Sequence, residues 1–321
     1  MKPEYFLGID TSNYTTSAAI VDAAGCVVAN CKRPLPVAPG ECGLRQSDAV
    51  FAHVKNLPSL MEEVREHLTG GRLAAIGVSE APRRAAGSYM PCFLSGVAAA
   101  ETAAAAASVP LYRFSHQCGH LAAAILSSGR FSLFDSPFGA FHVSGGTTEV
   151  LYVSSFGSDG FSVELVGGTA DLNAGQLVDR VGVMLGLRFP CGPALEELAA
   201  TCTSRVPKPR ISVRGMNANL SGIENQAQKM WKETGNAPLV AAYVLDVIAA
   251  TLAELTRALF AERGDVPVLY AGGVMCNKRI RSRLSPLGDT AFAEPQYSAD
   301  NAAGIALLCR RRHGECCGTG I

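Results

Sequence analysis

The segment FGAFHVSGGTTEVLYV, residues 138–153, has two apolar runs joined by a polar turn that contains two adjacent glycines. This order is typical of two β-strands connected as a hairpin. The segment YFLGIDTSNYTTSAAIV, residues 5–21, has the same order, with a polar turn over 10–16 between its apolar runs. We interpret the two segments as copies from an internal duplication, because a single recurrence at this separation does not fit a short-period repeat.

The rest of the chain alternates between helical and strand patterns. Apolar residues recur at helical spacing over 48–68, 91–108, 173–187, 237–261 and 301–312, and short apolar strand patterns cover 73–79, 109–112 and 266–271. This alternation, with glycines at strand ends, predicts an α/β protein with two related lobes and a cleft between them. We expect the first lobe over 1–132 and the second over 133–300, with a C-terminal helix over 301–321 that packs back on the first lobe.

The composition fits a folded, soluble protein. At roughly 100–200 residues per domain, 321 residues suggest two domains, and 48% hydrophobic with 17% charged residues excludes a disordered chain. Basic and acidic residues balance at 28 each, so any contact with nucleic acid must be local or shared with a partner. The N-terminal residues show no signal peptide, the apolar run over 93–109 contains Glu101, and the eleven scattered cysteines form no C-x-x-C pair. We therefore predict a reduced, cytoplasmic protein that does not enter a membrane.

His116 and His120 lie four residues apart in a segment that Ser115 is expected to cap as a helix. Residues i and i+4 share a helix face, so both imidazoles can reach one metal ion. The alternative is a pair of polar residues on a solvated face. Gln117 occupies the place of the glutamate that an H-E-x-x-H metallopeptidase uses as its general base, which argues against peptide hydrolysis.

Two turns with paired glycines are candidates for binding a nucleotide. In the turn 143–148, Gly145 and Gly146 allow backbone N–H groups to approach phosphate oxygens, although an ordinary hairpin turn explains the same residues. Gly272-Gly273 follows an apolar strand and precedes Asn277, whose amide suits the edge of a nucleotide base or a simple helix cap.

Two aspartates also have a structural alternative. Asp300 at a helix start is by itself most simply an N-cap. Asp10, followed by Thr11 and Ser12, suits a contact to Mg²⁺ and phosphate, and equally suits a hairpin turn.

The order and spacing of these motifs resemble one family, the tRNA threonylcarbamoyladenosine transferases (TsaD family), once described as O-sialoglycoprotein endopeptidases of peptidase family M22. The matching motifs span nearly the whole chain: 8–12, H-x-x-G-H over 116–120, V-S-G-G over 143–146, D-x-x-A-G-x-x-x-D-R over 171–180, L-G-L-x-x-P-x-G-P over 185–193, N-L-S-G-I over 219–223, G-G-V-x-x-N over 272–277 and S-A-D-N over 298–301. The resemblance implies a duplicated, two-lobe fold of the sugar-kinase/Hsp70/actin-like (ASKHA) type with a nucleotide cleft between the lobes.

The resemblance also implies roles for individual residues. One iron or zinc ion would be held by His116, His120 and Asp300. The adenylate substrate or ATP, with Mg²⁺ where one is used, would lie against His142, Val143, Ser144, Gly145 and Gly146, with its ribose and base near Asp179, Gly192 and Asn277. The implied enzyme is an acyltransferase that moves a threonylcarbamoyl group from threonylcarbamoyl-AMP to N6 of adenosine 37 in tRNA.

Three departures from the family motifs suggest a divergent paralogue. Thr147 stands where the family has a histidine, residues 13–16 lack two acidic residues, and the loop 79–84 reads S-E-A-P-R-R in place of a glycine-rich turn. One alternative is therefore a non-catalytic partner subunit that binds nucleotide and metal, and another is a carbamoyltransferase with a different acceptor. The retained metal and nucleotide residues favour the enzyme, because a binding subunit has little need of a metal triad.

Although the net charge is zero, basic residues form local clusters at 83–84, 208–214 and 278–283. Each alone is most simply a solvated surface. The last directly follows Asn277, however, so an RNA backbone lying there would bring an acceptor base to the nucleotide site. We predict weak, salt-sensitive binding of tRNA that a companion subunit strengthens. Both a homodimer and a heterodimer are compatible with the sequence.

Overall fold

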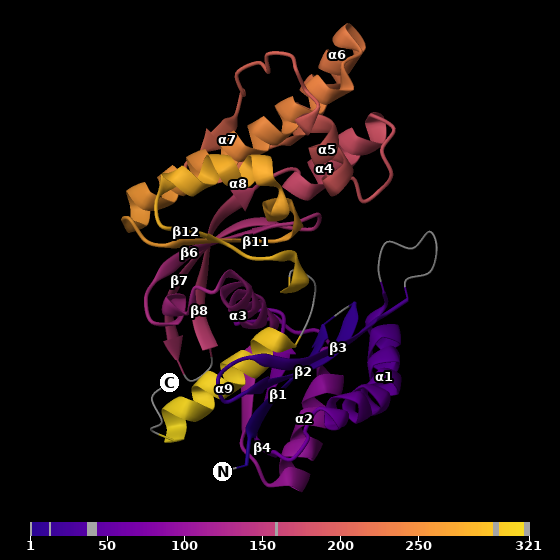
Figure 1. Ribbon diagram of the computed structural model, residues 1–321, viewed down its shortest axis with the longest axis vertical. Helices are drawn as coiled ribbons and strands as arrows, with labels where there is room; N and C mark the ends of the chain where they lie inside the picture. The colour runs from indigo at the N-terminus through magenta and orange to yellow at the C-terminus, as the bar shows by residue number, and fades with distance from the viewer. Residues whose placement is uncertain (1, 13, 37–43, 158–159, 298–301, 318–321) are drawn as a thin grey trace. The chain divides into compact units, whose positions relative to one another are not determined.

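The structure is a computed structural model that describes residues 2–12, 14–36, 44–157, 160–297 and 302–317 (Figure 1). The chain forms two compact units. The first comprises Met1–Ser127, Phe156–Ser162 and Ala299–Ile321, and the second comprises Ser128–Ser155 and Val163–Ser298. The domain limits expected from the sequence, 1–132 and 133–300, stay a prediction.

The first unit contains a five-stranded sheet in the order β3-β2-β1-β4-β5. Its strands are β1 (Glu4–Ser12), β2 (Thr15–Asp22), β3 (Val27–Pro34), β4 (Arg72–Ala81) and β5 (Leu111–Ser115). The first three strands form an antiparallel meander, and β4 and β5 run parallel to β1. The helices of this unit are α1 (Gln46–Glu66), α2 (Phe93–Ala107), α3 (His116–Ser128) and α9 (Ala303–Cys317).

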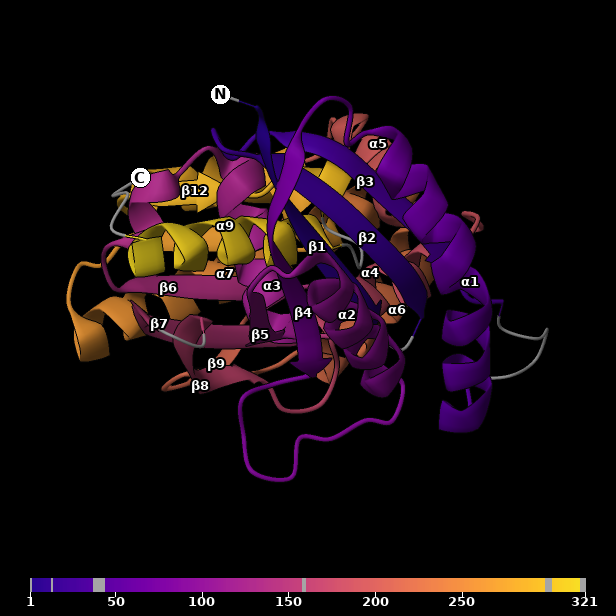
Figure 2. The same cartoon turned by 90° about the horizontal axis from the view of Figure 1, so that it is seen from below.

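Helices cover both faces of this sheet. Successive residues of β1 point to opposite faces, and the apolar side chains on each face pack against helices. Leu7 and Ile9 pack in one apolar cluster with Ala100 of α2. Phe6 points the other way, with its ring centroid 5.6 Å from that of His313 on α9. Figure 2 shows the strands of this unit between α9 and the pair α1 and α2.

A close approach of two glycines holds α3 against α9. A Cβ atom built on Gly304 would lie 1.9 Å from the carbonyl oxygen of Gly119, so a larger residue at 304 would push the two helices apart. This contact fixes the first turns of α3, which carry His116 and His120.

The first hairpin differs from the turn expected over 10–16. β1 continues through Ser12, so Asp10 and Thr11 are fully buried within a strand. Thr11 tolerates this burial because its hydroxyl group makes two hydrogen bonds. Oγ1 donates to the carbonyl of Cys92 at 3.0 Å and accepts from the N–H of Gly96 at 3.1 Å.

The second unit contains a seven-stranded sheet in the order β12-β11-β6-β7-β8-β10-β9. Its strands are β6 (Phe138–Val143), β7 (Thr148–Gly157), β8 (Gly160–Thr169), β9 (Ser212–Arg214), β10 (Asn217–Asn219), β11 (Val268–Ala271) and β12 (Thr290–Phe292). Its α-helices are α4 (Ala174–Met184), α5 (Gly192–Ala200), α6 (Ser221–Thr234), α7 (Ala237–Arg263) and α8 (Lys278–Leu284), and short 3-10 helices cover Phe131–Phe134, Gly273–Cys276, Ser285–Leu287 and Pro295–Tyr297.

The two sheets share one topology. The order β8-β7-β6-β11-β12 repeats β3-β2-β1-β4-β5, with three consecutive strands followed by two strands parallel to the first of them. The hairpins that begin the two sheets are the segments 5–21 and 138–153. The internal duplication expected from these segments is confirmed.

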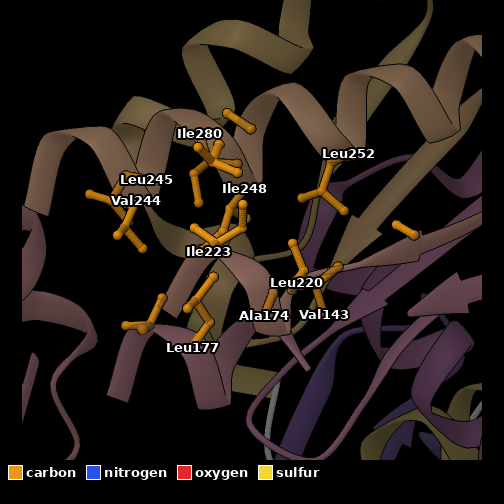
Figure 3. Packing of buried hydrophobic residues seen from close by; sticks show 14 of the residues in the cluster. Val143, Ala174, Leu177, Leu220, Ile223, Val244, Leu245, Ile248, Leu252 and Ile280 are labelled. Carbon is orange, nitrogen blue, oxygen red and sulfur yellow. The ribbon is translucent and has the colours of Figure 1, made fainter. Parts of the chain in front are cut away.

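The core of the second unit forms around α7. Val244, Leu245, Ile248 and Leu252 of this helix meet Leu177 of α4 in one apolar cluster (Figure 3). By length and composition α7 could cross a membrane, but 78% of its most apolar window is buried inside the protein. A helix that is apolar on all sides and buried in this way is a core helix.

Candidate functional site

The two histidines lie side by side at the start of α3. Ser115 precedes the helix, and its Oγ accepts a hydrogen bond from the N–H of Cys118 at 3.2 Å, as expected for a cap. The ring centroids of His116 and His120 are 4.3 Å apart. The helical spacing therefore places two imidazoles where one ion can contact both.

Asp10 orients the first of these histidines. Nδ1 of His116 lies 2.9 Å from Oδ1 of Asp10, and the hydroxyl of Ser79 donates to the same oxygen. A proton on Nδ1 that is donated to a carboxylate leaves Nε2 with a free lone pair for a metal. Asp10 thus lies where a carboxylate fixes the ring and tautomer of a metal ligand. Its expected contact to Mg²⁺ or phosphate stays a prediction.

These side chains fit a transition metal in their donor chemistry. Imidazole nitrogens suit iron and zinc, and a carboxylate behind a ligating histidine is the usual supporting partner. Within the described residues, no three histidine, cysteine, aspartate or glutamate side chains form a group that could hold an ion. Asp300, the expected third ligand, lies outside those residues. Ser12 Oγ is buried at the end of β1 and has no hydrogen-bond partner in the described part of the chain.

A cavity of about 410 Å³ in the second unit contains four of the residues expected to bind the nucleotide. Gly145, Asp179, Gly192 and Asn277 come from four separate segments and all line it. This volume lies in the range of roughly 300–1,000 Å³ that is usual for small-molecule sites.

The glycine turn at the edge of this cavity presents unpaired backbone N–H groups. The N–H of Ser144 bonds to the carbonyl of Thr147 at 2.7 Å, and Ser144 Oγ accepts from the N–H of Thr147 at 3.1 Å. Gly145 and Gly146 are exposed residues, and their N–H groups make no hydrogen bond to any residue that the structure describes. Two such donors in a turn are suited to phosphate oxygens.

Gly175 allows α4 to begin directly against this turn. Its N–H donates to the carbonyl of Ser144 at 3.1 Å, and a Cβ built on it would lie 2.5 Å from the N atom of Gly145. The positive end of the α4 dipole therefore lies at the glycine turn, where it favours an anion.

Asp179 and Asn277 also have structural partners. Oδ1 of Asp179 accepts from the N–H of Cys191 at 2.8 Å, which holds the segment before α5. Oδ1 of Asn277 accepts from the N–H of Ile280 at 3.0 Å, so Asn277 is the N-cap of α8. The remaining oxygen of Asp179 and the amide nitrogen of Asn277 are the groups left for a ligand.

The other two predicted nucleotide residues lie on β6, beside the turn. Val143 is fully buried in the core, so only its backbone can face a ligand, whereas His142 is partly exposed. His142 pairs with Ala271 at the end of β11, next to the second glycine turn.

Glu196 is a cavity residue that the sequence motifs did not identify. Glu196 lines the same cavity, and its Oε1 accepts from the N–H of Lys278 at 2.7 Å, joining α5 to α8. Its distance of four residues from Gly192 on α5 is the signal that could have identified it.

The two cysteines nearest the cavity are poor nucleophiles. Burial raises the pKa of Cys191, to which the charge of Asp179 also contributes. Burial also raises the pKa of Cys276. Both thiols are therefore protonated at neutral pH, which disfavours a thiolate nucleophile at this cavity.

In the basic cluster 278–283, which we expect to contact RNA, two arginines form ion pairs and hydrogen bonds within the protein. Arg279 forms a two-pronged ion pair with Asp246, with both N–O distances at 2.8 Å. Arg281 pairs with Glu294 at 3.0 Å and donates to two backbone carbonyls. Asp246 and Glu294 therefore already compensate the charges of these two arginines, and RNA binding by this cluster stays a prediction.

The cluster around 208–214 is different. Arg205, Lys208, Arg210 and Arg214 are all exposed, and none forms an ion pair with a residue in the described ranges. Four cations in a ten-residue segment of the second unit are therefore available to an anionic partner.

Comparison with known proteins points to one family. The family model described as TsaD, tRNA N6-adenosine threonylcarbamoyltransferase, matches residues 41–307. The chain is 29% identical, over 94% of its length, to the "Probable bifunctional tRNA threonylcarbamoyladenosine biosynthesis protein" of Methanothermobacter thermautotrophicus, and it spans 54% of that longer protein. It is 28% identical, over 96% of its length and 92% of the relative, to the tRNA N6-adenosine threonylcarbamoyltransferase of Carboxydothermus hydrogenoformans.

Solved structures show the same fold at low identity. The chain is similar to HypF of T. kodakarensis with a TM-score of 0.62 and 13% identity, over 99% of this chain and 48% of that one. It is similar to a ROK family glucokinase of Streptomyces griseus with a TM-score of 0.51 and 11% identity, over 95% of this chain and 98% of that one. These likenesses confirm the sugar-kinase/Hsp70/actin-like fold class and carry no conclusion about activity.

Proposed function

The chain belongs to the tRNA N6-adenosine threonylcarbamoyltransferase family, and we propose that it transfers a threonylcarbamoyl group from threonylcarbamoyl-AMP to N6 of adenosine 37 in tRNA. The observation that carries the proposal is the cavity in the second unit. Gly145, Asp179, Gly192 and Asn277 belong to separate motifs, and the fold brings them into one site.

In this proposal the cavity holds the adenylate part of the donor. The N–H groups of Gly145 and Gly146, with the start of α4 behind them, bind the phosphate. The carboxylate of Asp179 accepts from the ribose hydroxyls, and the amide of Asn277 meets the base. The glycine turn is already closed by hydrogen bonds between Ser144 and Thr147, and Asp179 and Asn277 are held by the N–H groups of Cys191 and Ile280. Little ordering is therefore needed when the donor binds.

His116 and His120, together with Asp300, would hold the metal ion in this proposal, and Asp10 would keep the His116 ring in the ligating tautomer. An iron or zinc ion bound there supplies Lewis-acid chemistry to carbonyl and phosphate oxygens. The support for this assignment is the 4.3 Å separation of the two rings and the hydrogen bond from His116 to the buried Asp10.

The transfer is a single exchange at the carbamoyl carbon. The N6 amine of the acceptor forms a C–N bond, the C–O bond to phosphate breaks, AMP leaves, and the proton of the attacking amine is released. The protonated thiols of Cys191 and Cys276 do not take part. The role of the chain is to hold the donor phosphate and to stabilise the negative charge that develops on it.

A second candidate is a partner subunit that binds the nucleotide without catalysis. Thr147 favours it, because this residue replaces a histidine of the family motif and its backbone is tied into the glycine turn. A histidine near the transferred group can move a proton, and a threonine cannot.

Direct assay separates the two candidates. We expect purified protein with threonylcarbamoyl-AMP and unmodified tRNA to produce N6-threonylcarbamoyladenosine, detected by mass spectrometry after nuclease digestion. The matched control is the same tRNA with guanosine at position 37. Tight nucleotide and metal binding with no product, even with candidate partner proteins added, would favour the subunit.

We propose that the protein binds tRNA in the cytoplasm and that the exposed basic segment 205–214 contacts the tRNA. A companion protein would strengthen this binding. Changing Lys208, Arg210 and Arg214 to glutamate should weaken tRNA binding. The slope of log Kd against log salt should fall by about one for each phosphate that the variant no longer neutralises. Binding titrations at several salt concentrations measure this slope.

The matched control reverses three exposed charges elsewhere, at Lys55, Arg65 and Lys232. An equal loss of affinity in both triple variants would mean that only net charge matters. An unchanged slope in the 208–214 variant would remove this segment from the RNA surface.

A further inference from the structure

A second hollow lies directly beside the donor cavity in the second unit. This groove, of about 690 Å³, is lined by Gln176, Val183 and Met184 of α4, by Phe189, and by Glu224 and Gln228 of α6. Gly145 and Asp179 line both the groove and the donor cavity, so the two spaces meet at the phosphate turn. We call the second space the acceptor groove.

The surface of the acceptor groove carries two unusually exposed apolar side chains. Phe189 is 73% exposed and Val183 is 56% exposed. The opposite side of α4 is buried, with Leu177 turned into the apolar core (Figure 3). The core therefore does not require a phenylalanine at 189, and an aromatic ring left in water beside a binding cavity is suited to stack on a flat ligand.

The polar groups of the groove fit the edges of a nucleobase. The side-chain amide of exposed Gln228 makes no hydrogen bond to any residue within the described ranges, and it can both donate and accept. Arg180 is paired with Glu224 at 3.0 Å, so the groove offers no uncompensated cation for a phosphate. An aromatic face combined with amide groups is how proteins hold unpaired bases of single-stranded RNA loops.

We propose that the acceptor groove binds the adenine that receives the transferred group, with Phe189 stacked on its face. This inference rests on the proposed function, because a transferase must hold its second substrate next to the first. The shared residues Gly145 and Asp179 bring the groove to the phosphate end of the donor, where the C–O bond breaks and the new bond to N6 forms. Phe189 is a positioning residue in this scheme.

The test measures the contribution of the base itself. Two anticodon stem–loop RNAs are compared, one with adenosine and one with an abasic residue at the acceptor position. Loss of a stacked base costs about 1–3 kcal/mol, so the abasic RNA should bind wild-type protein at least about fivefold more weakly. With Phe189→Ala the difference between the two RNAs should shrink by the stacking contribution, whereas Phe189→Tyr, which keeps the ring, should restore it.

Phe51→Ala is the matched control, because Phe51 is 71% exposed on α1 and lines neither space. It should behave as wild type. An abasic penalty of the same size in wild type and Phe189→Ala overturns the proposal, and so does the absence of any penalty in wild type.

Catalysis gives an independent readout. Phe189→Ala should raise the KM for tRNA by about tenfold while the affinity for the donor stays unchanged. If wild type modifies tRNA and Phe189→Ala has an unchanged KM, the groove assignment fails and the proposed function stands. If wild type modifies no tRNA, the proposed function fails, and the abasic comparison alone decides whether the groove holds a base.

Discussion

A variant with both His116 and His120 changed to alanine is expected to lose its bound iron or zinc and nearly all transfer activity. Removing the two imidazoles leaves at most one carboxylate ligand, which does not retain a transition metal at neutral pH. Lewis-acid stabilisation is worth several kcal/mol, so the loss of activity should be about a thousandfold or more. Elemental analysis of the purified protein and single-turnover transfer assays measure the two effects.

Two further variants make this result specific. Asp10→Asn removes the carboxylate that fixes the His116 ring, and should weaken metal binding by about 10–100-fold without abolishing it. His67→Ala removes an exposed histidine of the same unit and should change nothing. Stoichiometric metal in the double variant would show that the ion lies elsewhere.

The variant Gly145→Val is expected to lose nucleotide binding while its thermal stability stays the same. A Cβ at this position meets no atom within 4 Å, and the backbone φ lies outside the left-handed range, so the fold accommodates the side chain. The same side chain stands where the donor phosphate would approach the N–H groups of Gly145 and Gly146. Losing two hydrogen bonds to a charged group, each worth about 1.5–3 kcal/mol, should lower the affinity by at least about a hundredfold.

Two other glycines provide the comparison. Gly157→Val also meets no atom within 4 Å, and it should keep both stability and nucleotide affinity. Gly175→Val should lower the thermal stability of the protein, because its Cβ would lie 2.5 Å from backbone atoms of Ser144 and Gly145. Calorimetric titration with ATP or an adenylate analogue, alongside thermal melting, separates the three cases. An unchanged affinity in Gly145→Val would place the nucleotide outside this cavity.

Much of the fold follows from local patterns that a sequence displays directly. The helix predicted over 91–108 is α2 at Phe93–Ala107, and the one predicted over 237–261 is α7 at Ala237–Arg263. The repeated strand–turn–strand order indicated the duplication, which the two sheets share. Helical spacing alone placed His116 beside His120. These features are predictable because periodicity and capping depend on neighbours only a few residues away.

The environment of a polar residue was not predictable in the same way. The sequence predicts Asp10 as a turn residue or a phosphate contact. In the structure it is a buried strand residue that is hydrogen-bonded to His116 and Ser79, both of which are distant in the chain. Arg279 reads as a free surface cation, yet it is paired with Asp246 on α7. A side chain's charge and type are local properties, whereas its partner is chosen by the packing of remote segments.

The sequence by itself determined the family motifs, the α/β class, the duplication and which residue types are available for binding. Only the tertiary structure decided that Gly145, Asp179, Gly192 and Asn277 face one cavity, and that Phe189 stays exposed beside it. The physical reason is that backbone hydrogen bonding and apolar periodicity are set within a few residues, while a cavity exists only where several elements fail to fill the space between them.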